Sequence, residues 1–148
     1  MGAGGFRCGP VAYGGRRYRT SLPFRHALLR RPLGIHYPRF RARTEKQEFI
    51  FGRWNAEGRL VACLLLRPLG KHRGKLRQMA VARSQQGRGH GGVLVGWVEN
   101  WARRHGFRQL EMHARQHVLP FYRKLGYRPA AGPFREVGIL HHKLIKDL

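Results

Sequence analysis

A glycine-rich stretch, Gly87 to Gly92, constrains the fold most, because it separates two segments of different periodicity. Residues 75–81 read as an extended run, whereas apolar residues in 88–105 recur at steps of three and four, which is typical of a helix. Glycine lets a ligand approach the backbone closely, and the first N–H groups of a helix have no internal partner. A strand, a glycine-rich turn and a helix therefore predict a phosphate-binding turn. The alternative is a turn whose glycines serve only tight packing.

Two familiar phosphate-binding motifs fit this stretch poorly. No Gly-Lys-Ser/Thr follows, which excludes a Walker loop. Gly87, Gly89 and Gly92 have the spacing of a dinucleotide-binding fingerprint. That fingerprint also needs an acid about 20 residues further on at a strand end, and only Glu111 is available for the role.

The remaining pattern predicts an α/β (α+β) domain with a mixed sheet. Ser21 is expected to cap a helix that Pro32 stops, and a second helix at 88–105 ends at Gly106 with Glu99 facing outward. Further segments complete the prediction: a hairpin of 48–54 and 59–69, strands at 75–83, 108–115 and 136–145, a short helix at 118–126, and a loose segment over 1–17 with a short strand at 11–13.

The charge of the chain is strongly positive. Thirty Lys and Arg stand against 7 Asp and Glu, giving a net charge of +23 over 148 residues. Such a surface attracts polyanions, so nucleic acid, bound non-specifically, is a candidate partner. Arginine-rich composition alone is the alternative explanation. No apolar run is long enough for a membrane-spanning helix, and the two cysteines favour a reduced, cytoplasmic protein without membrane partners.

Two segments resemble the signatures of the GNAT superfamily of N-acetyltransferases. The segment "QMAVARSQQGRGHGGVLV" is similar to the acetyl-CoA-binding segment of this family, and "LPFYRKLGYRP" (119–129) to its second signature. The two occur in the family's order, about 35 residues apart. Weaker similarity extends from 25 to 148, so that the chain looks most like the ElaA-like subgroup.

The resemblance implies a single acetyltransferase domain over 18–148, with a splayed mixed sheet and acetyl-CoA as co-substrate. It implies that the backbone of the strand before the turn pairs with pantetheine, and that the N–H of Val81 polarises the thioester. The expected cofactor-binding residues are Met79, Ala80, Val81, Gln86, Gly87, Arg88, Gly89, His90, Gly91 and Arg115. Arg115 departs from the asparagine common in relatives. Tyr122 matches the tyrosine that often protonates the leaving thiolate, although it is also a plausible packing residue.

The base that removes the proton of the amine acceptor is less evident, because the strand before the turn carries no acid. Glu136 and His113 are the candidates; the alternatives are an ion pair for Glu136 and proton transfer through water. Neighbouring His141 and His142 point to opposite faces of a strand, so no metal is expected. The rival function is a nucleic-acid- or ribosome-associated binding protein with little catalysis. The sequence leaves the amine acceptor and the oligomeric state open.

Overall fold

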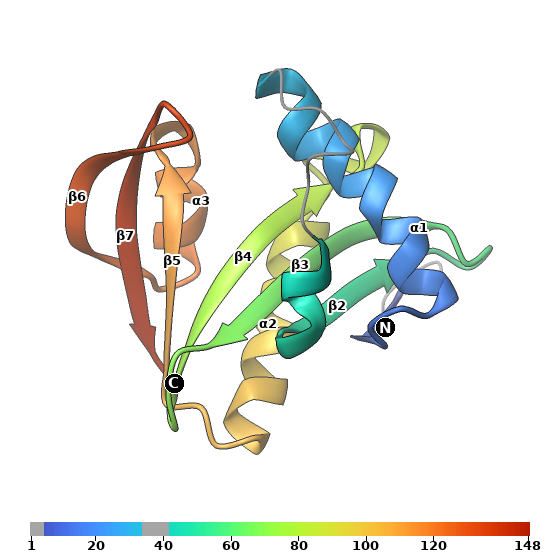
Figure 1. The fold of residues 1–148 in the computed structure, drawn as a ribbon, viewed down its shortest axis with the longest axis horizontal. Helices are drawn as coiled ribbons and strands as arrows, with labels where there is room; N and C mark the ends of the chain where they lie inside the picture. Colours follow the sequence, from blue (N-terminus) through green and yellow to red (C-terminus); the bar gives the residue numbers. More distant parts are fainter. Residues whose placement is uncertain (1–4, 34–41) are drawn as a thin grey trace. The chain divides into compact units, whose positions relative to one another are not determined.

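Seven strands form one mixed sheet in the order β1-β2-β3-β4-β5-β7-β6 in the computed structural model, which describes residues 5–33 and 42–148 (Figure 1). The predicted α/β (α+β) class, with a mixed sheet flanked by helices, is confirmed. The chain divides into two compact units, Met1–Leu66 with Gln78–Val98 and Arg67–Arg77 with Glu99–Leu148. The division passes through β4 (Arg73–Val81) and α2 (His90–Arg104).

The first unit is built on an antiparallel hairpin. β2 (Phe49–Trp54) pairs with β3 (Leu60–Pro68), as predicted, and Asn55 accepts the N–H of Gly58 in the turn between them. β3 is the apolar centre of this unit, since residues 61–66 are all buried. A strand buried on both faces explains the continuous apolar run in the sequence.

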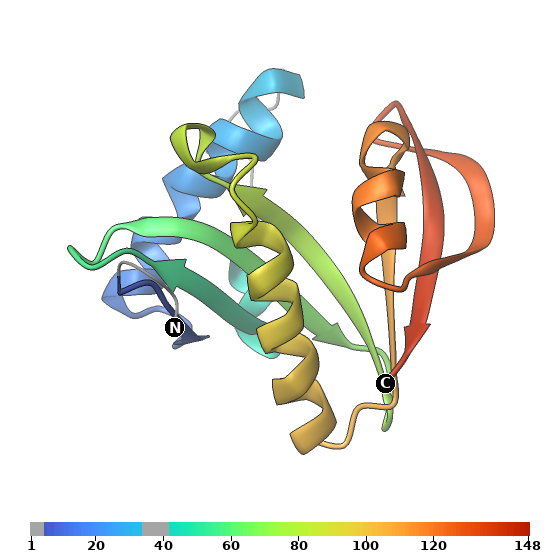
Figure 2. The same cartoon turned by 180° about the vertical axis from the view of Figure 1, so that it is seen from behind.

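Helices cover both faces of this hairpin. Ile50 packs in one cluster with Tyr18 of α1 (Arg16–Arg25), whereas the ring of Phe51 lies 5.8 Å from that of Trp97 in α2. Adjacent strand residues point to opposite faces, so α1 and the first half of α2 lie on opposite sides of β2 and β3 (Figures 1 and 2).

The second unit contains both parallel and antiparallel pairing. Residues Arg73–Leu76 of β4 run parallel to Gln109–Met112 of β5 (Gln109–Arg115). β5 pairs antiparallel with β7 (Ile139–Asp147), which pairs antiparallel with β6 (Arg128–Glu136). α3 (Leu119–Lys124) follows β5, close to the predicted 118–126.

The N-terminal part differs from the prediction. The strand β1 lies at Arg7–Val11, paired with β2, rather than at 11–13. α1 already begins at Arg16, so Ser21 lies inside the helix and its hydroxyl donates to the carbonyl of Tyr18 at 2.6 Å. The prediction that Ser21 caps the helix was therefore wrong; Gly15 takes the N-cap position without a side-chain hydrogen bond.

The strand β6 was not predicted. It contains Pro129 and Pro133, and nearly all its residues are exposed. Proline is tolerated on an edge strand, where an N–H is not needed for pairing, and β6 is the edge of the sheet. An edge strand without apolar alternation gives no periodic signal.

The prediction that Glu99 faces outward was also wrong. Glu99 is buried, and its carboxylate accepts the hydroxyl of Tyr127 at 2.8 Å and the ammonium of Lys146 at 3.0 Å. These two partners compensate the cost of burying a charge. No helix in the described part of the chain is long and apolar enough to cross a membrane.

Candidate functional site

The glycine-rich turn joins β4 to α2 as the sequence predicted. A 3₁₀ turn, Arg83–Gln85, follows β4, and the side-chain amide of Gln86 donates to the carbonyl of Val81 at 3.0 Å. Gly87 and Gly89 have φ values of +78° and +88°. The N–H of Val93 donates to the carbonyl of Gly89, so the N–H groups between these residues precede the first helical bond. The turn therefore has the backbone conformation that exposes helix N-terminal donors.

Two of the predicted turn residues, Gln86 and His90, already make hydrogen bonds within the protein. The N–H of Gln86 points to the carbonyl of Arg83 at 3.4 Å. The imidazole of His90 is buried, accepts the Arg53 Nε–H at its Nδ1 at 3.0 Å, and lies 4.5 Å from the ring of Phe6. Burial, with the charges of Arg53 and Arg88, lowers the pKa of His90. Because Nδ1 accepts from Arg53, a neutral His90 carries its proton on Nε2 and adds no positive charge to the turn.

Substituting Gly89 by alanine is expected to lower the free energy of unfolding by about 1–2 kcal/mol, because an L residue at φ +88° is strained. The matched control is Gly96→Ala. Gly96 lies inside α2, and a Cβ there meets nothing within 4 Å. This control should stabilise by about 0.5–1 kcal/mol, because alanine favours helix. Urea unfolding of both variants tests the opposite signs; equal effects would contradict a left-handed Gly89.

The second unit brings together two residues that the sequence suggested separately. His113 lies on β5 and Glu136 at the end of β6, and His113 Nδ1 is 2.9 Å from Glu136 Oε1. A carboxylate only accepts, so Nδ1 carries the proton and Nε2 keeps its lone pair in the neutral imidazole. The pair has the arrangement of a base oriented by a carboxylate.

The surroundings favour the ionised form of Glu136. Burial by itself would raise its pKa, but the hydrogen bond and charge of His113, with Lys75 and His141, bring the pKa of Glu136 below its usual value. His141 Nε2 lies 3.9 Å from Glu136 Oε2, and Phe134 packs edge-on against His113 at 4.9 Å. The interaction therefore stabilises the fold at pH values above the ordinary carboxyl pKa. This stabilisation is lost as the pH falls through the lowered pKa of Glu136.

Tyr122 lies on α3 and is buried. Its ring packs edge-on against Phe121 and Tyr127, with centroids 4.8 and 5.9 Å away. Burial raises the pKa of Tyr122 far above its ordinary value. The phenol therefore stays protonated at any working pH.

The other predicted residues have the following positions. Met79, Ala80 and Val81 lie in the part of β4 that belongs to the first unit, together with the turn, whereas Arg115 ends β5 in the second unit. Cys63 is buried. His142 contacts Gln116 Oε1 at 2.6 Å.

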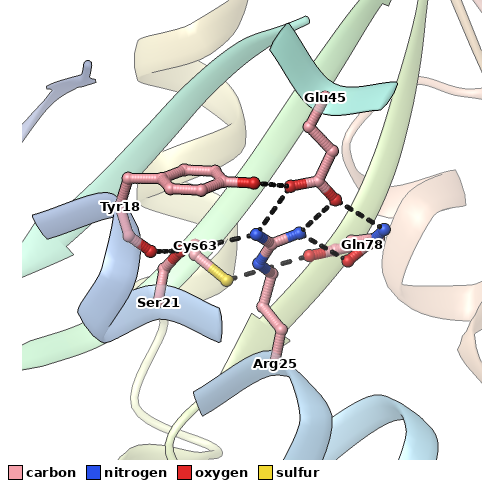
Figure 3. Close-up of polar contacts among 6 residues, drawn as sticks. All are labelled: Tyr18, Ser21, Arg25, Glu45, Cys63 and Gln78. Atoms are coloured by element: carbon pink, nitrogen blue, oxygen red, sulfur yellow. Dashed lines mark hydrogen bonds and ion pairs between the residues drawn. The ribbon is translucent and has the colours of Figure 1, made fainter. Parts of the chain in front are cut away.

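Sequence reasoning missed a buried polar cluster in the first unit. Arg25 of α1 and Glu45 of the 3₁₀ segment Ala42–Gln47 form an ion pair at 2.7 Å, with exposed fractions of 0% and 1% (Figure 3). Gln78 of β4 and Tyr18 complete the cluster. The segment around Glu45, ARTEKQ, is polar and the whole chain is basic, so neither charge stands out in the sequence as a buried one.

Comparison with known proteins supports the family resemblance. Residues 18–127 match the acetyltransferase (GNAT) family. The chain belongs to this family. It is 33% identical over 75 residues to the uncharacterized N-acetyltransferase YjcF of Bacillus subtilis (strain 168), a match that covers 50% of this chain and 54% of that protein. The chain thus spans about half the length of the curated relatives it matches.

Solved structures share the fold at low identity. Escherichia coli ElaA superimposes with a TM-score of 0.78 at 15% identity, covering 95% of this chain and 97% of that one. A GNAT family acetyltransferase from Elizabethkingia anophelis with acetyl-CoA bound gives a TM-score of 0.72 at 17% identity, covering 97% and 98%. At these identities the likeness concerns the fold.

Proposed function

We propose that the chain binds acetyl-CoA and transfers its acetyl group to a primary amine by direct attack. The observation that carries this proposal is the junction of β4 with α2, where the carbonyl of Val81 holds Gln86 and two left-handed glycines precede the helix. The backbone N–H groups at the start of α2 are suited to a pyrophosphate. The exposed side chains of Arg83 and Arg88 add positive charge. Family membership and a relative with acetyl-CoA bound support the same ligand.

The cofactor-binding set follows from that junction. Backbone groups of Met79, Ala80 and Val81 pair with pantetheine as an added strand would, and the N–H of Val81 polarises the thioester carbonyl. The pyrophosphate takes the turn, Gln86–Gly91. Because the N–H of Gln86 already faces Arg83, the later donors carry most of this contact. Arg115 contributes charge toward a cofactor phosphate or an acidic acceptor.

Tyr122 and His113 are the proposed acid and base. His113 Nε2 removes a proton from the amine, whose lone pair then attacks the thioester carbonyl carbon. The C–S bond breaks, and Tyr122 gives its proton to the departing thiolate sulfur. The second proton, which the nitrogen loses as it becomes an amide, returns the Tyr122 phenolate to its neutral form. The products are an N-acetylated amine and the free thiol of CoA. Glu136 orients His113 and stabilises the imidazolium.

The test of this function is amine-dependent release of the CoA thiol from acetyl-CoA, measured across a panel of primary amines. Acetylation of at least one amine, identified by its added mass, supports the proposal. Binding of acetyl-CoA without transfer to any amine would leave only the cofactor part of it.

Substituting His113 by glutamine is expected to lower kcat about 10²-fold, and Glu136→Gln about tenfold. The double variant should be no slower than His113→Gln alone, because the two residues act as one unit.

The matched control is His117→Gln, since His117 is exposed just beyond β5. It should leave kcat unchanged. Additive losses in the double variant would mean that Glu136 and His113 do not work together on the proton.

The charge of the chain supports a second candidate, binding of nucleic acid. Of the seven acids, Glu45, Glu48, Glu99 and Glu111 are buried, so the described surface is more basic than the net charge of +23 suggests. Binding through this surface alone would weaken steeply with salt and show little base preference.

A further inference from the structure

Gln78 has an unusual backbone conformation in the middle of β4. Its φ is +55°, in the left-handed region that a non-glycine residue rarely adopts within a strand. Such a conformation persists only where the surroundings hold it. Gln78 immediately precedes Met79, Ala80 and Val81, so its φ sets the direction in which their backbone groups point.

Both ends of the Gln78 amide are held. Arg25 NH1 donates to Gln78 Oε1 at 2.7 Å, and Gln78 Nε2 donates to Glu45 Oε2 at 3.3 Å (Figure 3). The thiol of Cys63, on the adjacent strand β3, lies 3.9 Å from the backbone carbonyl of Gln78. The side chain and the backbone of this residue are therefore tied to three different elements.

The residues that hold Gln78 form a rigid anchor. The guanidinium of Arg25 contacts both oxygens of Glu45, at 2.7 and 2.8 Å, and the hydroxyl of Tyr18 donates to Glu45 Oε1 at 2.8 Å. A forked pair of this kind fixes orientation as well as charge. A buried pair of charges is often no more stabilising than apolar residues of the same volume, so its value here lies in the geometry that it imposes.

We propose that Arg25 and Glu45 position the cofactor-binding backbone, by clamping Gln78 in its left-handed conformation so that Met79–Val81 present their peptide groups to pantetheine. The three residues Arg25, Glu45 and Gln78 are called the Gln78 clamp. This inference rests on the proposed function. Without the clamp, Gln78 relaxes toward the ordinary β region, and the peptide groups that follow turn away from the ligand. Gln78 is thus a positioning residue and takes no part in proton transfer.

The test compares Gln78→Ala with Tyr18→Phe. The alanine variant loses both amide contacts of the clamp. The phenylalanine variant loses the hydrogen bond from Tyr18 to Glu45 and keeps Arg25 on Gln78. Acetyl-CoA is titrated into each folded variant by calorimetry, its KM and that of an amine acceptor are measured, and thermal unfolding is recorded beside them.

We expect Gln78→Ala to raise the Kd and KM of acetyl-CoA about tenfold, with the KM of the amine unchanged, because preorganisation of the binding strand is lost. Tyr18→Phe should lower the melting temperature and leave the Kd within about twofold. An unchanged Kd in Gln78→Ala, or an equal rise in both variants, would overturn the clamp. Absence of acetyl-CoA binding to the unaltered protein would instead overturn the proposed function.

Discussion

Substituting Tyr122 by phenylalanine is expected to lower kcat about 10³-fold while the KM of acetyl-CoA stays within about twofold. The change removes one hydroxyl and keeps the ring, which packs against Phe121 and Tyr127. Because burial raises the pKa of Tyr122, the phenol is protonated throughout the working range and acts as an acid only. Its loss leaves the thiolate to depart without a proton.

The matched control is Tyr13→Phe, the same chemical change at an exposed position, which should leave kcat unchanged. Rates are measured by thiol release at saturating acetyl-CoA. The Tyr122→Phe variant should keep its melting temperature within a few degrees, so that a slow rate is not a folding defect. A kcat within threefold of the unaltered protein would contradict the acid role.

Substituting Glu45 by glutamine is expected to lower the free energy of unfolding by about 3–5 kcal/mol, the cost of leaving one partner of a buried ion pair uncompensated. Arg25 is fully buried beside it. Burial alone would lower the pKa of Arg25, but the hydrogen bonds and charge of Glu45 raise it, so the guanidinium stays charged. The amide of glutamine cannot match this charge.

The control for this variant is Glu57→Gln in the exposed turn between β2 and β3, which should change the free energy by less than about 0.5 kcal/mol. Urea unfolding measures both. A loss below about 1 kcal/mol in Glu45→Gln would mean that the Arg25–Glu45 pair contributes little, and the clamp on Gln78 would lose its anchor.

Periodicity in the sequence predicted the parts of the fold whose burial is one-sided or complete. The helix after the glycine turn was predicted because residues such as Leu94 and Val98 recur on one face, and both are fully buried. The hairpin of β2 and β3 was predicted from two strand-like segments, 48–54 and 59–69, on either side of turn residues at 55–58. In these segments local pattern and tertiary packing agree.

The sequence failed where tertiary contacts override local pattern. β6 is a proline-containing edge strand with little burial, and α1 begins without a side-chain cap. Glu99 lies on the buried side of α2 because Tyr127 and Lys146, far along the chain, supply its partners. No local signal reports partners that are 28 and 47 residues away.

The candidate site was predictable only where it depends on local sequence. The glycine turn is local, so its left-handed residues and the start of α2 followed from the sequence. His113 and Glu136 were each candidates, but their contact depends on the register of β5, β7 and β6. The Gln78 clamp joins three segments that are 20 to 53 residues apart, and nothing in their local sequence relates them.

Calorimetric titration of acetyl-CoA and of acetyl-pantetheine, at moderate salt, tests the central claim most directly. The turn between β4 and α2 is proposed to hold the pyrophosphate, which acetyl-pantetheine lacks. We expect acetyl-CoA to bind with a Kd of about 1–100 μM and acetyl-pantetheine at least about 100-fold more weakly. Equal affinity for both ligands, or for an unrelated polyanion such as inorganic triphosphate, would contradict a pyrophosphate cradle and favour binding through general positive charge.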